Sequence, residues 1–440
     1  MKLRPFELAL IIGFGFLGIG ALILLATSSP SGEDTTDPTY VGPVQIWGTV
    51  PAGPMTQILS DLATSDEVYE KVSYRYIAPE EFNQTITESL ADGLGPDLLF
   101  TSHEQLVEQR RRIRAIPFES FPLRDFQDLY IDGAQVHALA DGVYGYPIMV
   151  DPLMMYWNED ILTNNGFLAA PRTWEELVNV QLPAMVDRSF DRTINRSVVA
   201  FGVYNNTKHA FGVLSMLLIQ SGSNLVQEDL RNPELVQYDI GLTKTVVREV
   251  NPFANSLSFY LRFSQPANTL YSWNRSFGND LTQFISEDLV FYFGYGSEGK
   301  EIQRLNPNLN FDIAEVPQGA SADVRRTYGQ FYALSPLRSS DNIDGAFKVM
   351  SRLSSDDLNI AIANNYSMVP TKRSLIALGS NDTFGRLSYR SAPITYGWLN
   401  PDRSTVDGIF MEMVSDVSEN RNDVKSATDD AEQKLREIYD

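Results

Sequence analysis

The first part of the chain contains one long apolar run. Residues 8–26, LALIIGFGFLGIGALILLA, carry no charge, and Lys2 and Arg4 precede them. A helix needs about 20 apolar residues to cross a membrane, whereas the apolar part of a signal peptide is shorter. The pattern predicts an uncleaved transmembrane anchor over residues 1–26, with a cleaved signal peptide or a buried core helix as alternatives. The basic residues favour a cytoplasmic N-terminus.

A polar stretch follows the apolar run. Residues 27–39, TSSPSGEDTTDPT, are rich in Ser, Thr, Pro and Asp and contain no large apolar side chain. Such a composition is typical of a flexible linker, so residues 27–41 are predicted to be a tether. Together the two segments predict a single-pass protein of the cell membrane whose large body lies outside the cytoplasm.

Beyond the tether, strand-like runs alternate with stretches of helical apolar spacing. They read as strand, helix, strand, helix, strand over residues 44–47, 55–62, 72–77, 82–90 and 98–100. This alternation predicts a parallel α/β architecture. Ligands of such sheets bind beyond the carboxyl ends of the strands.

Strand-like and helical segments continue to alternate toward the C-terminus. Helices are predicted over residues 210–220 and 343–353, and strands over 289–293 and 328–334. Residues 407–439 are predicted to be helical, with a charged break at 419–422.

The amino-acid composition limits which ligands and which kinds of site the protein can have. The formal net charge is −21, which disfavours nucleic-acid binding. The arginines 110, 111, 112 and 114 are interpreted as a local solvated cluster. The chain has no cysteine and three histidines, so disulfides are excluded and a multi-histidine metal site is disfavoured. No cofactor is predicted.

Several motifs occur in a characteristic order. They are residues 95–100 (GPDLLF), 145–147 (GYP), 151–158 (DPLMMYWN) and 171–177 (PRTWEEL), with further matches at 218–222 and 369–373. In order and spacing they resemble the family 1 extracellular solute-binding proteins of ABC importers, the group that contains maltose-binding protein. The likeness extends from about Val44 to the C-terminus. A lipoprotein cysteine, found in Gram-positive members, is lacking.

The resemblance implies an α/β, two-lobed periplasmic-binding-protein-like fold of type II. It implies an N-lobe of residues 42–150 plus 322–368 and a C-lobe of residues 151–321 plus 369–440. The chain would cross between them near Val150, Ser321 and Val369. A small polar solute, with a carbohydrate favoured, would bind between the lobes and close them, and the partner would be an ABC transporter permease.

Candidate ligand-binding residues come from the resemblance and from positions at strand ends. Aromatic rings suit the flat faces of a sugar, and carboxylates and amides suit its hydroxyls. The candidates are Asp151, Tyr295, Trp398, Tyr396, Trp47, Thr49, Thr101, His103, Glu104, Lys208 and Gln330; no catalytic residue is predicted.

Several of these positions also have a structural interpretation. Asp151 is equally suited to a turn before Pro152, and Trp47 to the core. His103 is suited to capping the next helix. The glycines around Tyr295 would open space beside its ring, and Asp402 and Arg403 would form an ion pair at a helix start.

Two other functions remain open. The same fold would serve a sensory receptor ectodomain that passes the ligand's presence to a partner. An anchored extracellular glycoside hydrolase would need two carboxylates about 5–10 Å apart, and the chain is rich in acidic residues.

Overall fold

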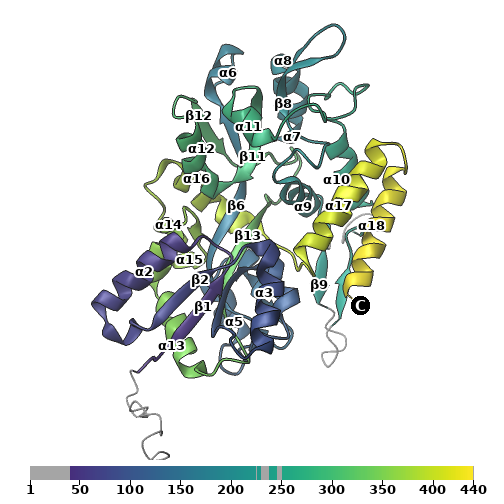
Figure 1. Ribbon diagram of the computed structural model, residues 1–440. Helices are drawn as coiled ribbons and strands as arrows, with labels where there is room; N and C mark the ends of the chain where they lie inside the picture. Colours follow the sequence, from purple (N-terminus) through teal and green to yellow (C-terminus); the bar gives the residue numbers. More distant parts are fainter. Residues whose placement is uncertain (1–39, 224, 229–236, 245–249, 440) are drawn as a thin grey trace, which may run out of the picture. The chain divides into compact units, whose positions relative to one another are not determined.

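The computed structural model describes residues 40–223, 225–228, 237–244 and 250–439 (Figure 1). The chain divides into two units, Met1–Val41 and Gly42–Asp440, and the second is the body considered below. The predicted anchor and most of the predicted tether lie outside the described residues. Among the helices that are described, none combines the length and apolarity needed to cross a membrane.

One large mixed sheet runs through the body. In the described residues its strands follow the order β2-β1-β3-β13-β6-β11-β8-β7, and β12, β14 and β15 pair beside this path. The bounds are β1 (Val44–Gly48), β2 (Val72–Tyr76), β3 (Leu98–Ser102), β6 (Tyr146–Asn158), β7 (Asp187–Arg188), β8 (Ile194–Val199), β11 (Leu289–Tyr295), β12 (Phe311–Ala314), β13 (Thr327–Pro336), β14 (Val369–Pro370) and β15 (Thr395–Tyr396). Strands β1, β2 and β3 are parallel, as the alternating pattern predicted.

Strand β6 changes partners near its middle. Asp151 and Pro152 pair with Gln330 and Gly329 of β13, whereas from Leu153 onward β6 pairs with β11. Nearly every residue of β6 is buried, as expected for a central strand covered on both faces. Because β13 also pairs with β3, strands β6 and β13 join the β1–β3 part of the sheet to the β11–β8 part. The lobe boundaries drawn from the sequence stay a prediction.

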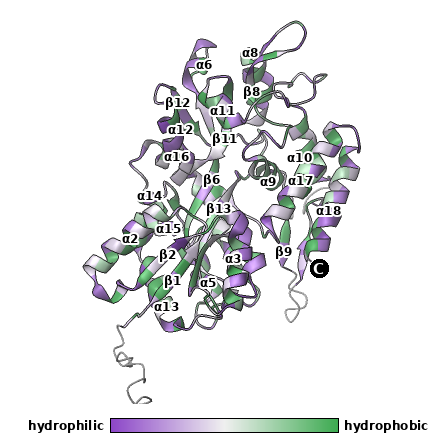
Figure 2. Cartoon of the chain, in the orientation of Figure 1, coloured by the Kyte–Doolittle hydropathy of each residue, from purple (hydrophilic) through white to green (hydrophobic). Residues whose placement is uncertain are grey.

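Helices cover the sheet where the apolar spacing predicted them. Helices α9 (Ala210–Gln220) and α13 (Ile343–Leu353) have the predicted bounds. Helix α9 is buried along almost its whole length and packs against β13 and α10 (Pro252–Leu261). Helices α2 (Ala52–Ser65), α3 (Pro79–Ala91), α14 (Asp356–Asn365), α17 (Arg403–Ser418) and α18 (Val424–Tyr439) carry more polar faces. Figure 2 shows this mixed colouring along α18 and largely apolar colouring along β6.

The interpretation of the arginine cluster is wrong for one member. Arg110 is 6% exposed. Its Nη2 lies 2.6 Å from Glu228 Oε1 and 3.0 Å from Asp141 Oδ1. A buried guanidinium needs such partners, so Arg110 ties the segment after β3 to β9 (Val226–Glu228).

Candidate functional site

A cleft of about 610 Å³ opens between the β1–β3 part of the sheet and the start of helix α17. It is lined by Thr49, Pro79, Glu80, Asn83, Gln84, Ser102, Glu104, Gln105, Glu108, Gln330, Tyr332, Asp402, Arg403, Ser404 and Asp407. Thr49 and Ser102 lie at the carboxyl ends of β1 and β3, where ligands of α/β sheets bind. The lining is mostly polar, so it suits a ligand that is rich in hydrogen-bonding groups.

Glu104 is the best-fixed carboxylate of the cleft. It lies in the 3-10 turn η2 (His103–Gln105) after β3 and is 5% exposed. Its Oε1 accepts a hydrogen bond from the Tyr328 hydroxyl, and its Oε2 accepts one from Gln330 Nε2 at 2.9 Å. Both donors belong to β13, so the joining strand orients this carboxylate.

Tyr332 and Gln330 extend this network along β13. The Tyr332 hydroxyl donates to Gln330 Oε1 at 2.9 Å. Burial, followed by the charges of Asp151 and Glu104, raises the pKa of Tyr332 well above its ordinary value. The hydroxyl therefore stays protonated, and the Tyr332 ring adds apolar surface to the cleft wall.

Arg403 faces the network from the first turn of α17. Its Nε lies 3.5 Å from Glu104 Oε1, and its Nη1 lies 2.7 Å from Asp407 Oδ1. The guanidinium also lies 3.8 Å from the centroid of the Phe211 ring. Asp402 does not form the expected ion pair with Arg403, because it caps α17 by accepting a hydrogen bond from Ser404 N.

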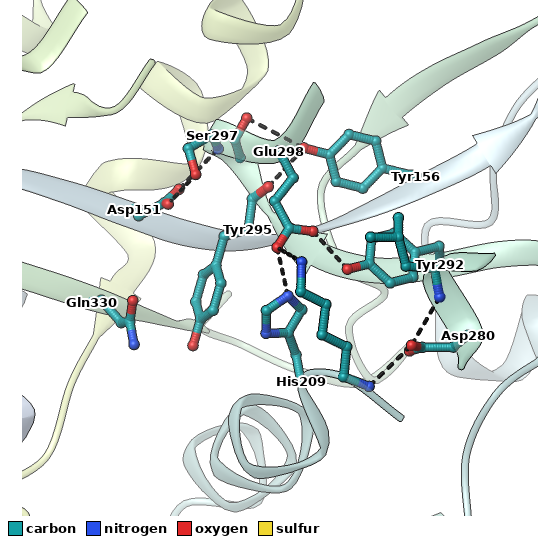
Figure 3. Close-up of polar contacts among 12 residues, drawn as sticks. Asp151, Tyr156, His209, Asp280, Tyr292, Tyr295, Ser297, Glu298 and Gln330 are labelled. Carbon is teal, nitrogen blue, oxygen red and sulfur yellow. Dashed lines mark hydrogen bonds and ion pairs between the residues drawn. The ribbon is translucent and has the colours of Figure 1, made fainter. Parts of the chain in front are cut away.

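A second polar cluster surrounds Glu298 (Figure 3). Its carboxylate accepts hydrogen bonds from Lys208 Nζ at 2.8 Å and from the Tyr292 hydroxyl at 2.6 Å, and it lies 2.6 Å from His209 Nε2. Burial alone would raise the pKa of Glu298. The charge and hydrogen bond of His209, then those of Lys208, outweigh burial and hold that pKa at about 2.

Asp151 sits where β6 changes partners, and its carboxylate is buried. Its Oδ1 accepts from Ser297 N at 3.1 Å and its Oδ2 from Ser297 Oγ at 2.5 Å. Burial raises the pKa of Asp151 to about 7, against the opposing effect of these hydrogen bonds. Asp151 is not among the residues that line the cleft.

Tyr295 is 8% exposed, and the space beside it is filled. A Cβ on Gly294 would lie 2.4 Å from the Tyr292 ring and 2.6 Å from Glu298 Oε2, and one on Gly296 would lie 2.4 Å from Ser388 Oγ. The expectation that these glycines open room for a ligand is therefore wrong. Gly294 instead allows close packing against Tyr292 and Glu298, and Gly296 allows it against Ser388.

The structure brings Thr49, Glu104 and Gln330 to the cleft and leaves the other candidates outside its lining. Trp398 lies in the core, where its Nε1 donates to Ser215 Oγ at 3.1 Å. Trp47 is 4% exposed and packs under Arg75.

The remaining candidates are also outside the cleft lining. His103 is fully buried and burial lowers its pKa to about 3, so it is a neutral core histidine. Thr101 is buried in β3, and the half-buried Tyr396 lies beside Arg326. Lys208 belongs to the Glu298 cluster.

Several lining residues were missed by sequence reasoning. Tyr332 lies two residues after Gln330 on the same strand, and that spacing places both side chains on one face. Glu80, Asn83 and Glu108 face the cleft from α3 and α4 (Leu106–Gln109), and no local signal marks them. Among the described residues, no group of three or more His, Asp or Glu side chains is arranged to hold a metal ion.

Solved structures share this fold. A cyclo/maltodextrin-binding protein complexed with maltotetraose has a TM-score of 0.69 at 15% identity, covering 90% of this chain and 96% of its own. The sugar-binding protein MalE from Xanthomonas citri has a TM-score of 0.69 at 17% identity, covering 90% and 97%. A solute-binding protein of an ABC transporter from Thermotoga lettingae, bound with alpha-D-tagatose, has 0.66 at 17%, covering 90% and 99%.

These likenesses define the class of fold, the α/β periplasmic-binding-protein fold of MalE, over about nine-tenths of the chain. No family model matches the sequence, and no curated protein matches it either.

Proposed function

We propose that this protein is an extracytoplasmic solute-binding protein of an ABC importer that captures a sugar or oligosaccharide without catalysis. The observation that carries the proposal is the fixed network of Glu104, Gln330 and Tyr332 at the wall of the cleft. Oriented carboxylate and amide groups suit sugar hydroxyls, and the network lies where ligands of this fold class are expected. The three neighbours described above are named as binding proteins, and two of them are bound to sugars.

The proposal includes movement about the joining strands. Residues 42–150 plus 322–368 would form one lobe, and residues 151–321 plus 369–440 the other. The cleft would then be lined by side chains from both, since Thr49 and Glu104 would belong to the first lobe and Arg403 and Asp407 to the second. A ligand that contacts both sides would favour closure, because it gains contacts only in the closed state.

The predicted anchor and tether would hold the protein at the cell membrane. A single N-terminal helix would hold the body at the outer face of the membrane, next to a permease that receives the solute. Labelling of an engineered cysteine in the body of intact cells tests this arrangement. Labelling by a membrane-impermeant reagent is expected, and protection until the cells are lysed would contradict it.

A ligand screen tests the binding function. A saccharide that binds the folded body raises its melting temperature by mass action. Glu104→Gln should reduce that shift, since the introduced amide would replace a charged acceptor and could turn its own donor toward Gln330 Nε2. The matched control is Glu437→Gln, an exposed residue of α18. If no saccharide shifts the melting temperature of the wild type, the proposed ligand class is wrong.

A further inference from the structure

The charges that line the cleft are unbalanced. Among the described residues, five carboxylates line it, those of Glu80, Glu104, Glu108, Asp402 and Asp407, and Arg403 is the single basic residue of the lining. The Arg403 guanidinium already faces Glu104 and Asp407. Within the described part of the chain, Glu80, Glu108 and Asp402 have no ion pair within 4.0 Å. Three carboxylates therefore face the cleft without a paired cation.

These three carboxylates come from opposite walls. Glu80 begins α3 and Glu108 lies in α4, whereas Asp402 caps α17. Burial, followed by the charge of Asp402, raises the pKa of Glu108 even though Arg112 opposes the shift. The carboxylates of Glu108 and Asp402 thus repel each other across the cleft. Closing the cleft would increase this repulsion unless a positive charge entered between them.

Two polar side chains in the same cleft independently indicate a ligand. Ser102 and Gln105 are 6% and 7% exposed and both line the cleft. Among the described residues, the Ser102 hydroxyl has no hydrogen-bond partner. Gln105 has one long side-chain hydrogen bond there, in which its Oε1 accepts from Thr49 Oγ1 at 3.5 Å. Within the described ranges, neither Ser102 Oγ nor Gln105 Nε2 belongs to the fully enclosed atoms that lack a partner, so both are open toward the cleft that they line. Their free hydrogen-bonding capacity there points to a hydroxyl-bearing occupant.

The cleft has little aromatic surface for stacking. In the part of the chain that the structure describes, Tyr332 is the one aromatic residue of the lining, and Trp47, Tyr295 and Trp398 are not part of it. Recognition therefore depends on hydrogen bonds and charge more than on ring faces. An ammonium group offers three donors and a positive charge, which suits carboxylates that have no cation of their own.

We propose that the ligand is a saccharide that carries a primary ammonium group, an unacylated amino sugar, held by Glu80, Glu108 and Asp402 while Ser102 and Gln105 bind its hydroxyls. This inference rests on the proposed function and narrows its ligand class. The same carboxylates would disfavour uronic acids and phosphorylated sugars by repulsion.

Titration calorimetry on the purified full-length chain tests the inference at pH 6.5 and low salt. The probes are a glucosamine trimer, its N-acetylated form, cellotriose, a trigalacturonate and spermidine. Since each exposed ion pair contributes up to about fivefold in affinity, the glucosamine trimer is expected to bind at least about tenfold more tightly than cellotriose. High salt should reduce this preference, and the trigalacturonate should bind weakest.

Charge-neutral variants locate the effect. Glu108→Gln combined with Asp402→Asn should reduce the preference for the glucosamine trimer over cellotriose about tenfold. Asn keeps the helix cap of α17. Asp382→Asn, which caps α16 (Thr383–Ser391) far from the lining, is the matched control and should change neither affinity.

Each result separates the inference from the proposed function. Equal binding of cellotriose and the glucosamine trimer, or an unchanged preference in the double variant, would overturn the amino-sugar inference and leave sugar binding standing. Binding of spermidine with no saccharide bound would overturn both. Preference for the glucosamine trimer over all other probes would support both.

Discussion

At the scale of single residues, two buried carboxylates show how surroundings decide charge. Glu298 and Asp151 both lose solvation, and burial alone would raise the pKa of each. Glu298 has His209 and Lys208 beside it, and its pKa stays at about 2. Of the described residues, only Ser297 donates side-chain or backbone hydrogen bonds to the Asp151 carboxylate, its donors are neutral, and the pKa of Asp151 reaches about 7.

Asp151 should make the stability of the protein depend on pH. Its folded pKa of about 7 lies above the ordinary 3.8, so its contribution is full below pH 3.8 and is lost as the pH rises through 7. Asp151→Asn mimics the protonated form. We expect the variant to be more stable than the wild type by about 2 kcal/mol at pH 8, and the difference to shrink toward pH 4. Urea unfolding at both pH values measures this, and parallel pH profiles of the two proteins would contradict the assignment.

Glu298 should behave in the opposite way. Its folded pKa lies below the ordinary 4.5, so its contribution is present above pH 4.5 and is lost as the pH falls toward 2. The Glu298 Oε1 atom faces Lys208 and His209, and its Oε2 accepts from Tyr292. Glu298→Gln removes the charge and replaces one of these two acceptor oxygens, so it should lower the unfolding free energy at pH 7 by about 2 kcal/mol. The exposed Glu301→Gln is the matched control and should leave stability nearly unchanged. Equal stability of Glu298→Gln and the control would show that the cluster is not stabilising.

At the scale of elements, the close approach of β13, β6 and β15 determines how the sheet is joined. Gly329 pairs with Pro152 of β6 at the point where that strand changes partners. A Cβ on Gly329 would lie 2.4 Å from Thr395 Cγ2 and 2.7 Å from the Asp151 backbone oxygen. The backbone oxygen cannot rotate away, so only glycine fits without a shift of the strands.

Gly329→Ala should therefore destabilise the body by about 2 kcal/mol, the usual cost of overpacking a core. Gly408→Ala in α17 is the matched control, because a Cβ there meets nothing within 4 Å. In a helix interior, Ala is favoured over Gly by up to about 1 kcal/mol. Chemical unfolding measures the free energy of unfolding of both variants. A Gly329→Ala variant as stable as the wild type would contradict the close packing of β13 against β6 and β15.

The elements themselves could be predicted from the sequence because periodicity is local. The α9 and α13 patterns gave the observed bounds. Helix α17 starts at Arg403, before the predicted start at residue 407, because Asp402 caps it. The site was harder to predict because it depends on which strand ends meet. Trp398 follows a loop in the sequence, yet its indole reaches Ser215 in the core. Glu108 and Asp402 are far apart in the sequence, and only the fold brings them to one cleft.

At the scale of the whole body, the proposed function requires that the cleft closes when a ligand binds. Glu104 and Arg403 approach to 3.5 Å from the two sides of the cleft. A saturating saccharide should hold these sides in contact and so reduce the mean radius of gyration measured by small-angle X-ray scattering. Arg403→Ala removes the facing cation and leaves Glu104 buried without it, so the ligand-free variant should have a larger radius than the wild type. An unchanged radius in both experiments would exclude closure as the response to ligand.

Calorimetric titration of the wild type and of Glu104→Gln with a panel of neutral and amino saccharides tests the central claim most directly. We expect at least one saccharide to bind the wild type with a stoichiometry of about one, and the variant to bind it about tenfold more weakly, because a hydrogen bond to a charged acceptor is lost. Absence of saccharide binding by the folded wild type, or equal binding by the variant, would contradict the claim that this cleft is a sugar-binding site.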